Sequence, residues 1–281
     1  MVLIFSEIEA LRSKQRRMRS RGINMPVMNK NYSASKVLYE ELTPGEFRER
    51  MAVAPIAYLS LGTLEWHGEH MPLGSDGIQP FEFFMEVAVE VGGIVLPTLF
   101  LGPDKMEVLD GLEYYGKDRG NNPDLEKQQY VKQKLPGSIY WIPDTLFISL
   151  IENILKQLKR QGFKIMMAHG HGPSTNLIIN HSAEWEAEFG IKIFHLWGSE
   201  NDEWEGFMSD HGAMLETSVV MKYRPELVNM NNLPKDPDIW PVGIRGHDPR
   251  IYASAEKGEE IVKNTRQRII ISLKAELGKL T

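Results

Sequence analysis

The 281-residue sequence predicts an α/β fold, with a mainly parallel central sheet and helices on both of its faces. Short apolar runs of β-type composition alternate with longer stretches in which apolar residues recur at helical spacing. This order is typical of right-handed βαβ units, whose crossover helices cover a parallel sheet. Polar clusters containing histidine follow several predicted strands, which is where ligand sites of such sheets lie.

The first predicted elements are a helix and a strand. Thr43, Pro44 and Glu46 form the pattern of an N-cap, a first-position proline and a capping box, so a helix is expected from Pro44 onward. Residues 56–61 form an apolar run that ends at Gly62, which is typical of a buried strand.

The remaining elements follow from the same signals. Apolar residues repeat along 144–161 at helical spacing, where Asp144 can act as the cap and Gly162 as the stop. Shorter apolar runs predict strands. The predicted strands are 94–97, 163–168 and 191–196, and the predicted helices are 78–91, 144–161, 176–189, 213–223 and 255–277.

The chain is predicted to hold an N-terminal extension, residues 1–36, followed by a single domain over 37–281. The extension carries a basic cluster at 12–21, which is either a solvated helix face or an arm that contacts a partner. Residues 102–134 are polar and weakly periodic, and they are too long for an ordinary connection. We predict that they form an insertion or lid.

Composition excludes several classes of protein. The net charge of -6 gives no general affinity for phosphate backbones, so a nucleic-acid partner is not expected. There is no cysteine, so any metal must be held by imidazole and carboxylate groups. No apolar run reaches the roughly 20 residues that span a bilayer, and no secretory signal is seen. A cytoplasmic protein without a membrane partner is therefore expected.

The polar cluster after the strand at 56–61 contains Glu65, His67 and Asp76. Glu65 and His67 are two positions apart, so in an extended chain they point to the same side. Asp76 returns after a loop that contains glycine and proline. Glutamate, histidine and aspartate together are ligands that suit a divalent cation.

Two further clusters follow later elements. His171 lies between Gly170 and Gly172, which allow the backbone to approach a ligand closely. His211 precedes Glu216, which is placed early in a predicted helix. A lone histidine or glutamate is more often a surface residue than a ligand. Three clusters at the ends of separate elements together predict a metal or catalytic site.

These clusters resemble the creatininase (creatinine amidohydrolase) family. GTLEWHGEHMP at 62–72, followed by Asp76, is similar to the family motif G-x-x-E-Q-H-G-x-H-L-P and its aspartate. Residues 169–176 resemble G-H-G-G-N, residues 211–218 resemble H-A-G-x-x-E-T-S, and residues 135–138 resemble F-P-G-T. The motifs occur in the family order, with the likeness extending from about 38 to 275.

The resemblance implies a three-layer α/β/α domain and a homohexamer. It also implies two divalent ions per chain, of zinc, manganese or iron, with Asp76 bridging them and His211 transferring protons. Glu216 is assigned both as a ligand and as a catalytic residue. The implied metal ligands are Glu65, His67, Asp76, His171 and Glu216.

Three departures from the family pattern bear on the substrate. Trp66 replaces a glutamine, and Pro173, Ser174 and Thr175 stand where the family has one glycine before Asn176. Creatinine-cleaving members carry a carboxylate at the position of Pro173, so creatinine itself is not the expected substrate. Candidate substrate-binding residues, chosen for their polarity and position, are Trp66, His70, Lys105, Tyr114, Tyr115 and Arg119.

The leading functional prediction is a metal-dependent hydrolase that uses a metal-activated water to open a cyclic amide or related C–N bond of a small molecule. One alternative is ring-opening C–C hydrolysis of a cyclic polyol diketone derived from inositol, such as 3-dehydro-scyllo-inosose. Another is a non-catalytic metal-binding scaffold. The chain lacks the phosphate-binding loop, the H-E-x-x-H helix and the G-x-S-x-G elbow of other enzyme classes.

Overall fold

A computed structural model describes residues 36–119, 135–198 and 206–280 of the chain. All described residues belong to one compact unit, Ala34–Thr281. Residues 1–35 of the predicted extension and residues 120–134 of the predicted insertion lie outside the described residues.

The central sheet has the strand order β2-β1-β5-β6, and every neighbouring pair is parallel. Its strands are β2 (Ile94–Val95), β1 (Ile56–Leu61), β5 (Ile165–Gly170) and β6 (Lys192–Phe194). The last residues of the two central strands, Leu61 and Gly170, are paired in register. The segments that follow β1 and β5 therefore leave the sheet side by side.

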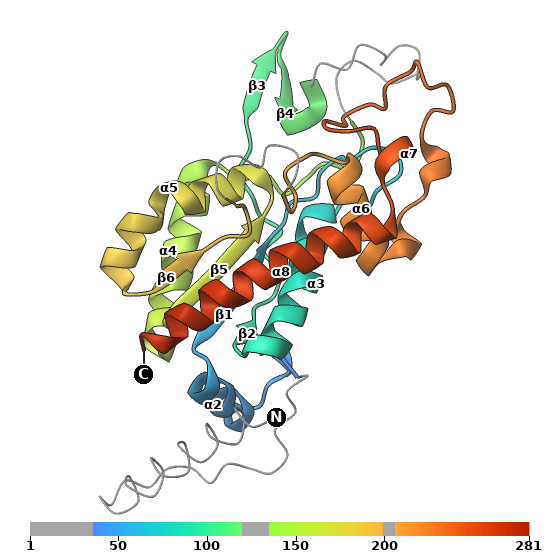
Figure 1. The fold of residues 1–281 in the computed structure, drawn as a ribbon. Coiled ribbons are helices and arrows are strands. Elements are labelled where there is room, and N and C mark those ends of the chain that lie inside the picture. Colours follow the sequence, from blue (N-terminus) through green and yellow to red (C-terminus); the bar gives the residue numbers. More distant parts are fainter. Residues whose placement is uncertain (1–35, 120–134, 199–205, 281) are drawn as a thin grey trace, which may run out of the picture. The chain divides into compact units, whose positions relative to one another are not determined.

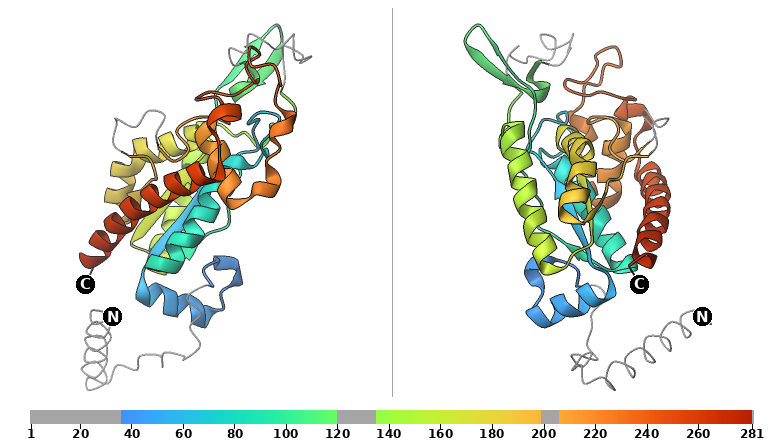
Figure 2. Two further views of the ribbon diagram at one scale, coloured as in Figure 1. Left: turned by 45° about the vertical axis from the view of Figure 1, so that its right-hand side comes forward. Right: turned by 90° about the vertical axis from the view of Figure 1, so that its left-hand side faces the viewer.

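Helices cover both faces of this sheet (Figures 1 and 2). One face packs against α3 (Ser75–Val91), α6 (Met214–Tyr223) and α8 (Ala255–Gly278), and the other against α4 (Asp144–Gln161) and α5 (Gly172–Phe189). Successive strand side chains point to opposite faces, so Tyr58 enters the first core and Leu59 the second. The predicted three-layer α/β/α architecture and mainly parallel sheet are confirmed.

The smaller elements surround this framework. The predicted capping box is present, because the Glu46 N–H donates to Thr43 Oγ1 and the Thr43 N–H donates to Glu46 Oε2. The smaller helices are α2 (Pro44–Val53) and α7 (Pro249–Tyr252), and the 3₁₀ segments are η1 (Tyr39–Glu41), η2 (Gly116–Arg119), η3 (Pro225–Leu227) and η4 (Met230–Asn232).

Three predicted boundaries differ near the ends of the central strands. Helix α3 begins at Ser75 rather than at 78, which places Asp76 in its first turn. Strand β5 runs to Gly170 rather than ending at 168. Helix α5 begins at Gly172 rather than at 176, because Pro173 is compatible with a first helical turn and the Thr175 N–H donates to the His171 carbonyl.

The region predicted as an insertion begins with an antiparallel hairpin. Strands β3 (Met106–Leu109) and β4 (Leu112–Tyr115) are joined by Asp110 and Gly111, which both have positive φ, at 51° and 78°. A two-residue Asp-Gly turn of this kind matches the twist of a hairpin. Figure 1 shows the hairpin extending beyond the carboxyl ends of the central strands.

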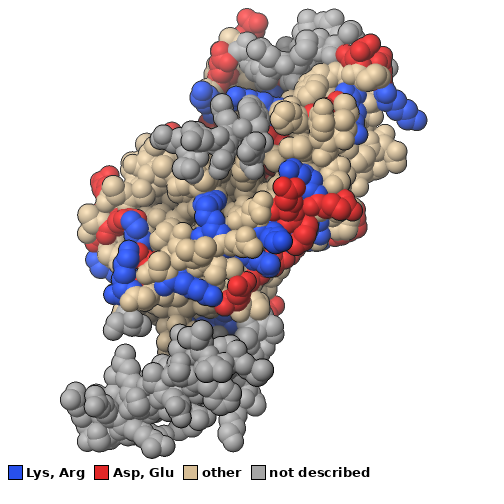
Figure 3. Space-filling model, viewed as in Figure 1, with Lys and Arg blue, Asp and Glu red and all other residues tan. Residues whose placement is uncertain are grey.

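The outer surface near α8 carries Lys, Arg, Asp and Glu side chains that are interspersed (Figure 3). Such mixing fits a solvated helix face. In the described part of the chain, no helix combines the length and the apolar character that a membrane span requires.

Candidate metal centre

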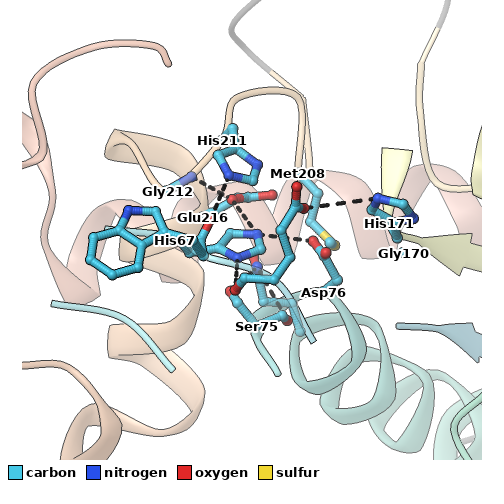
Figure 4. A network of polar contacts seen from close by, with 12 residues as sticks. His67, Ser75, Asp76, Gly170, His171, Met208, His211, Gly212 and Glu216 are labelled. Atoms are coloured by element: carbon cyan, nitrogen blue, oxygen red, sulfur yellow. Dashed lines mark hydrogen bonds and ion pairs between the residues drawn. The ribbon is translucent and has the colours of Figure 1, made fainter. Parts of the chain in front are cut away.

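Five buried polar side chains meet where the central strands end (Figure 4). Two of them come from the segment after β1, one from the first turn of α3, one from the end of β5 and one from the first turn of α6. They are Glu65, His67, Asp76, His171 and Glu216, and each is at most 3% exposed. The structure thus brings all five predicted ligands into one place.

The first ligand group, called here the His67 group, consists of His67, Asp76 and Glu216. His67 Nε2 lies 3.1 Å from Asp76 Oδ1 and 3.6 Å from Glu216 Oε2. On the other side of the ring, Nδ1 donates to the Glu65 carbonyl at 3.0 Å. That bond orients the ring so that Nε2 faces the two carboxylates, where it can bind a cation once its proton is lost.

The second ligand group, called here the His171 group, consists of Glu65, Asp76 and His171. His171 Nε2 lies 3.8 Å from Glu65 Oε2, and Nδ1 lies 3.1 Å from Ser174 Oγ. A bond from Nδ1 to Ser174 would leave Nε2 facing the carboxylates and able to bind a cation once it is deprotonated, as in the His67 group. Figure 4 shows His67 and His171 on opposite sides of Asp76.

The spacing of these atoms fits bound cations. Two ligand atoms about 2.1 Å from one cation lie about 3.0–3.4 Å apart in octahedral or tetrahedral geometry. The separations of 3.1 Å between His67 Nε2 and Asp76 Oδ1 and of 3.6 Å between His67 Nε2 and Glu216 Oε2 are close to this range, and Asp76 belongs to both groups. Asp76 Oδ2 and His171 Nε2 are buried and have no hydrogen-bond partner among the described residues. Nitrogen and oxygen ligands of this kind suit zinc, manganese or iron.

The pKa values of the buried groups also fit a site for cations. Burial raises the pKa of Glu65 to about 7 and that of Glu216 to about 8. Burial opposes the charge on Asp76 as well, but His67 outweighs it and holds the pKa of Asp76 below its usual value. Burial also opposes the charge on His67, but Asp76 and Glu216 outweigh it and raise the pKa of His67 to about 10. A proton on His67 thus balances the carboxylates in the absence of metal, and a bound divalent cation would take its place.

His211 lies beside the His67 group without sharing its hydrogen bonds. Its Nε2–H donates to the Trp66 carbonyl at 2.8 Å, and its ring stacks on His67 with centroids 4.2 Å apart. Burial, with the charge of His67, holds the pKa of His211 well below its usual value. His211 is therefore a neutral imidazole with its lone pair at Nδ1, which makes it a proton acceptor before it can be a donor.

A cavity of about 390 Å³ opens beside both groups. Its wall includes three cationic side chains, Lys105, Lys117 and Arg245. Of the predicted substrate-binding residues whose side chains the structure describes, Lys105 alone lines this cavity. Arg119 belongs to η2, but its side chain is not described.

The other predicted substrate-binding side chains lie away from this cavity, and their contact with a substrate stays a prediction. Trp66 packs with Leu135 and Val242 and donates its Nε1–H to the Val242 carbonyl, so it forms no cavity wall. His70 is buried against Thr217, with Nε2 2.8 Å from Oγ1.

The two tyrosines of β4 also lie outside the cavity wall. Tyr114 is buried, and Tyr115 packs on Trp141 and donates its hydroxyl to Glu113. Asp104 and Lys117, which flank the hairpin and line the cavity, were not predicted from the sequence. The Asp-Gly turn was the available signal, because it implies that the residues just outside both strands lie together.

The fold and the buried ligand groups define a class, that of three-layer α/β proteins with residues that could hold metal ions beyond a parallel sheet. Residues 40–273 match the creatininase family, described as creatinine amidohydrolase. This span covers most of the chain, so the chain belongs to the creatininase family and is a hydrolase of that family.

Individual relatives agree with this assignment. A creatinine amidohydrolase from Pseudomonas putida is 25% identical over 276 residues, which cover 86% of this chain and 98% of that protein. A mutant creatininase complexed with creatine is 25% identical with a TM-score of 0.63, covering 85% of this chain and 98% of the other. A manganese form of creatininase is 23% identical with a TM-score of 0.62 and the same coverage, and a mutant creatininase of Zn–Zn type is also similar in fold.

Proposed function

We propose that this protein is a divalent-metal-dependent hydrolase, which binds two ions per chain and opens a cyclic amide or a related C–N bond. The observation that carries the proposal is the pair of buried ligand groups that share Asp76. When bound, two divalent cations would polarise a substrate carbonyl and lower the pKa of water. The ligands proposed are the five residues of the His67 and His171 groups.

His211 is the residue we propose for proton transfer. Its Nδ1 lone pair can accept a proton from the attacking water, whose oxygen bonds to the carbonyl carbon. The same imidazole can then give that proton to the nitrogen as the C–N bond breaks. The hydrogen bond from Nε2 to the Trp66 carbonyl keeps the ring in this orientation throughout.

Creatinine is not the substrate we propose, because Pro173 supplies no carboxylate beside His171. The cavity wall favours a polar ligand, since it presents Lys105, Lys117 and Arg245 together with Ser209 and Asp210. This polarity supports a second candidate reaction, the ring-opening C–C hydrolysis of a cyclic polyol diketone. In that reaction the proton goes to the departing carbon rather than to a nitrogen.

A substrate screen separates these candidates. Protein reloaded with Zn²⁺ or Mn²⁺ would be incubated with five- and six-membered cyclic amides and with inositol-derived diketones, and new carboxylates would be detected by NMR. Turnover of one class selects the reaction. If the protein holds two ions and turns over neither class of substrate, the result would support the third hypothesis, a non-catalytic metal-binding scaffold.

We also propose that the protein is a homohexamer. This proposal follows from the family and is independent of the site. Light scattering coupled to size-exclusion chromatography tests it: a species of six 32.1 kDa chains is expected, and a stable monomer would contradict it.

A further inference from the structure

Asp104 brings a carboxylate to the His171 group from outside the predicted ligand set. Its Oδ2 lies 3.5 Å from His171 Nε2, and its side chain is 11% exposed. The other oxygen, Oδ1, accepts the backbone N–H of Lys105 at 2.6 Å. One oxygen is thus anchored to the chain, while the other faces the imidazole.

The contact between Asp104 and His171 is not an ordinary hydrogen bond. The separation exceeds the about 2.7–3.2 Å typical of N–H···O bonds, and His171 Nε2 has no hydrogen-bond partner among the described residues. A proton on Nε2 makes this contact a long ion pair in the absence of metal. A divalent cation that displaced this proton would lie within reach of both Nε2 and the Asp104 carboxylate.

Glu65 meets Asp104 at Gly116, the first residue of η2. A Cβ atom at Gly116 would lie 2.5 Å from Asp104 Oδ2 and 2.9 Å from Glu65 Oε1, and Gly116 has a positive φ of 50°. Only a glycine leaves space for both carboxylates there. The base of the hairpin therefore holds two carboxyl groups close together beside His171.

We propose that Asp104 is a further ligand of the cation that the His171 group binds. The carboxylate absent at Pro173 is then replaced by one that arrives from the base of the β3–β4 hairpin. The inference rests on the proposed function, since it assumes that the His171 group holds a divalent ion. It adds a ligand that is remote in sequence from all three clusters of the predicted site.

Zinc binding tests this inference without any substrate. Metal-free protein would be titrated with Zn²⁺ against a chromophoric chelator, and bound zinc would be counted by mass spectrometry. Asp104→Asn keeps an acceptor for the Lys105 N–H, so its fold should be retained, and Asp104→Ala removes both oxygens. Glu113→Gln is the matched control, because it removes an acidic charge from the same hairpin outside the cavity wall.

The expected result is that wild-type protein and Glu113→Gln bind two zinc ions with the same affinities. Both Asp104 variants should bind one of the two ions about 10- to 100-fold more weakly and keep the other. If both variants keep wild-type melting temperatures and bind both ions with unchanged affinity, Asp104 is not a ligand. The proposed function would not be affected by that result. Wild-type protein that binds no zinc would instead overturn the proposed function.

Discussion

Asp76 Oδ1 lies 3.1 Å from His67 Nε2, while Asp76 Oδ2 is buried without a hydrogen-bond partner among the described residues. The second oxygen is therefore available to the His171 group, to which Asp76 also belongs. Asp76 can belong to both groups because α3 begins at Ser75. This start places Asp76 in the first turn of the helix, near the paired ends of β1 and β5.

Asp76→Ala should reduce the affinity for both ions and lower turnover by about 10²–10⁴-fold, because metal charge contributes several kcal/mol to such reactions. Metal content by mass spectrometry and kcat would be measured together. Glu90→Gln, which removes an exposed carboxylate from the same helix, is the control. Loss of only one ion in Asp76→Ala would show that Asp76 is not shared.

His211→Ala should retain both metal ions and lower kcat by about 10²–10⁴-fold, because it removes the proposed proton carrier. His211 also lies within reach of Glu65 and His67, in a third arrangement that could hold an ion. The metal count therefore decides between the two roles. A variant with one ion fewer would make His211 a ligand instead.

Lys117→Met should raise KM about tenfold with a smaller change in kcat, because a charged contact to a polar substrate is worth about 1.5 kcal/mol. Lys117 lines the cavity and interacts electrostatically with Asp76 and His211. Steady-state kinetics on the substrate found in the screen would measure both constants. Lys263→Met, on the exposed side of α8, is the control. An equal KM in the two variants would show that Lys117 does not bind the substrate.

Gly170→Ala should lower the free energy of unfolding by at least about 2 kcal/mol, as measured by urea denaturation. Gly170 has φ 153°, and an added Cβ would overlap the Leu61 carbonyl of the neighbouring strand. Gly172→Ala is the matched control, since nothing lies within 4 Å of its Cβ position, and it should change stability by less than about 0.5 kcal/mol. Equal stabilities would contradict the close approach of β1 and β5.

His70 should make stability pH-dependent between about pH 6.5 and 4. Burial, with the charge of His67, lowers its pKa from 6.5 to about 4. Its contribution is then full above the unfolded pKa and is lost as the pH falls toward the folded pKa, because the unfolded state binds the proton more readily. The full loss is at most about 3 kcal/mol.

Metal-free protein would be used to measure this pH dependence, so that loss of ions does not contribute. The His70→Gln variant can still donate to Thr217, and its unfolding free energy should vary less over this range than that of the wild type. Parallel curves for the two proteins would show that His70 does not titrate in this way.

The framework and the meeting of the five polar side chains could be predicted from sequence because their signals are local. Glu65, His67 and His171 follow strands whose ends must meet in a parallel sheet, and Glu216 opens a helix. The cavity wall could not be predicted in the same way. Asp104 and Lys117 reach the site only because a hairpin pairs the residues between them.

The other predicted substrate-binding residues lie away from the cavity for the same physical reason. Side-chain polarity predicted contact with substrate for Tyr115 and His70, but each polar group is satisfied within the protein, by Glu113 and Thr217. The hydrogen-bond partner of a polar side chain depends on tertiary packing. It therefore cannot be predicted from periodicity along the chain.

The most direct test is a crystal structure of the zinc-loaded protein with an anomalous difference map at the zinc edge. Two peaks per chain are predicted. One should be bound by the His67 group and the other by the His171 group together with Asp104, and Asp76 should contact both. A map without peaks at these residues, or with zinc bound only elsewhere on the chain, would contradict the account.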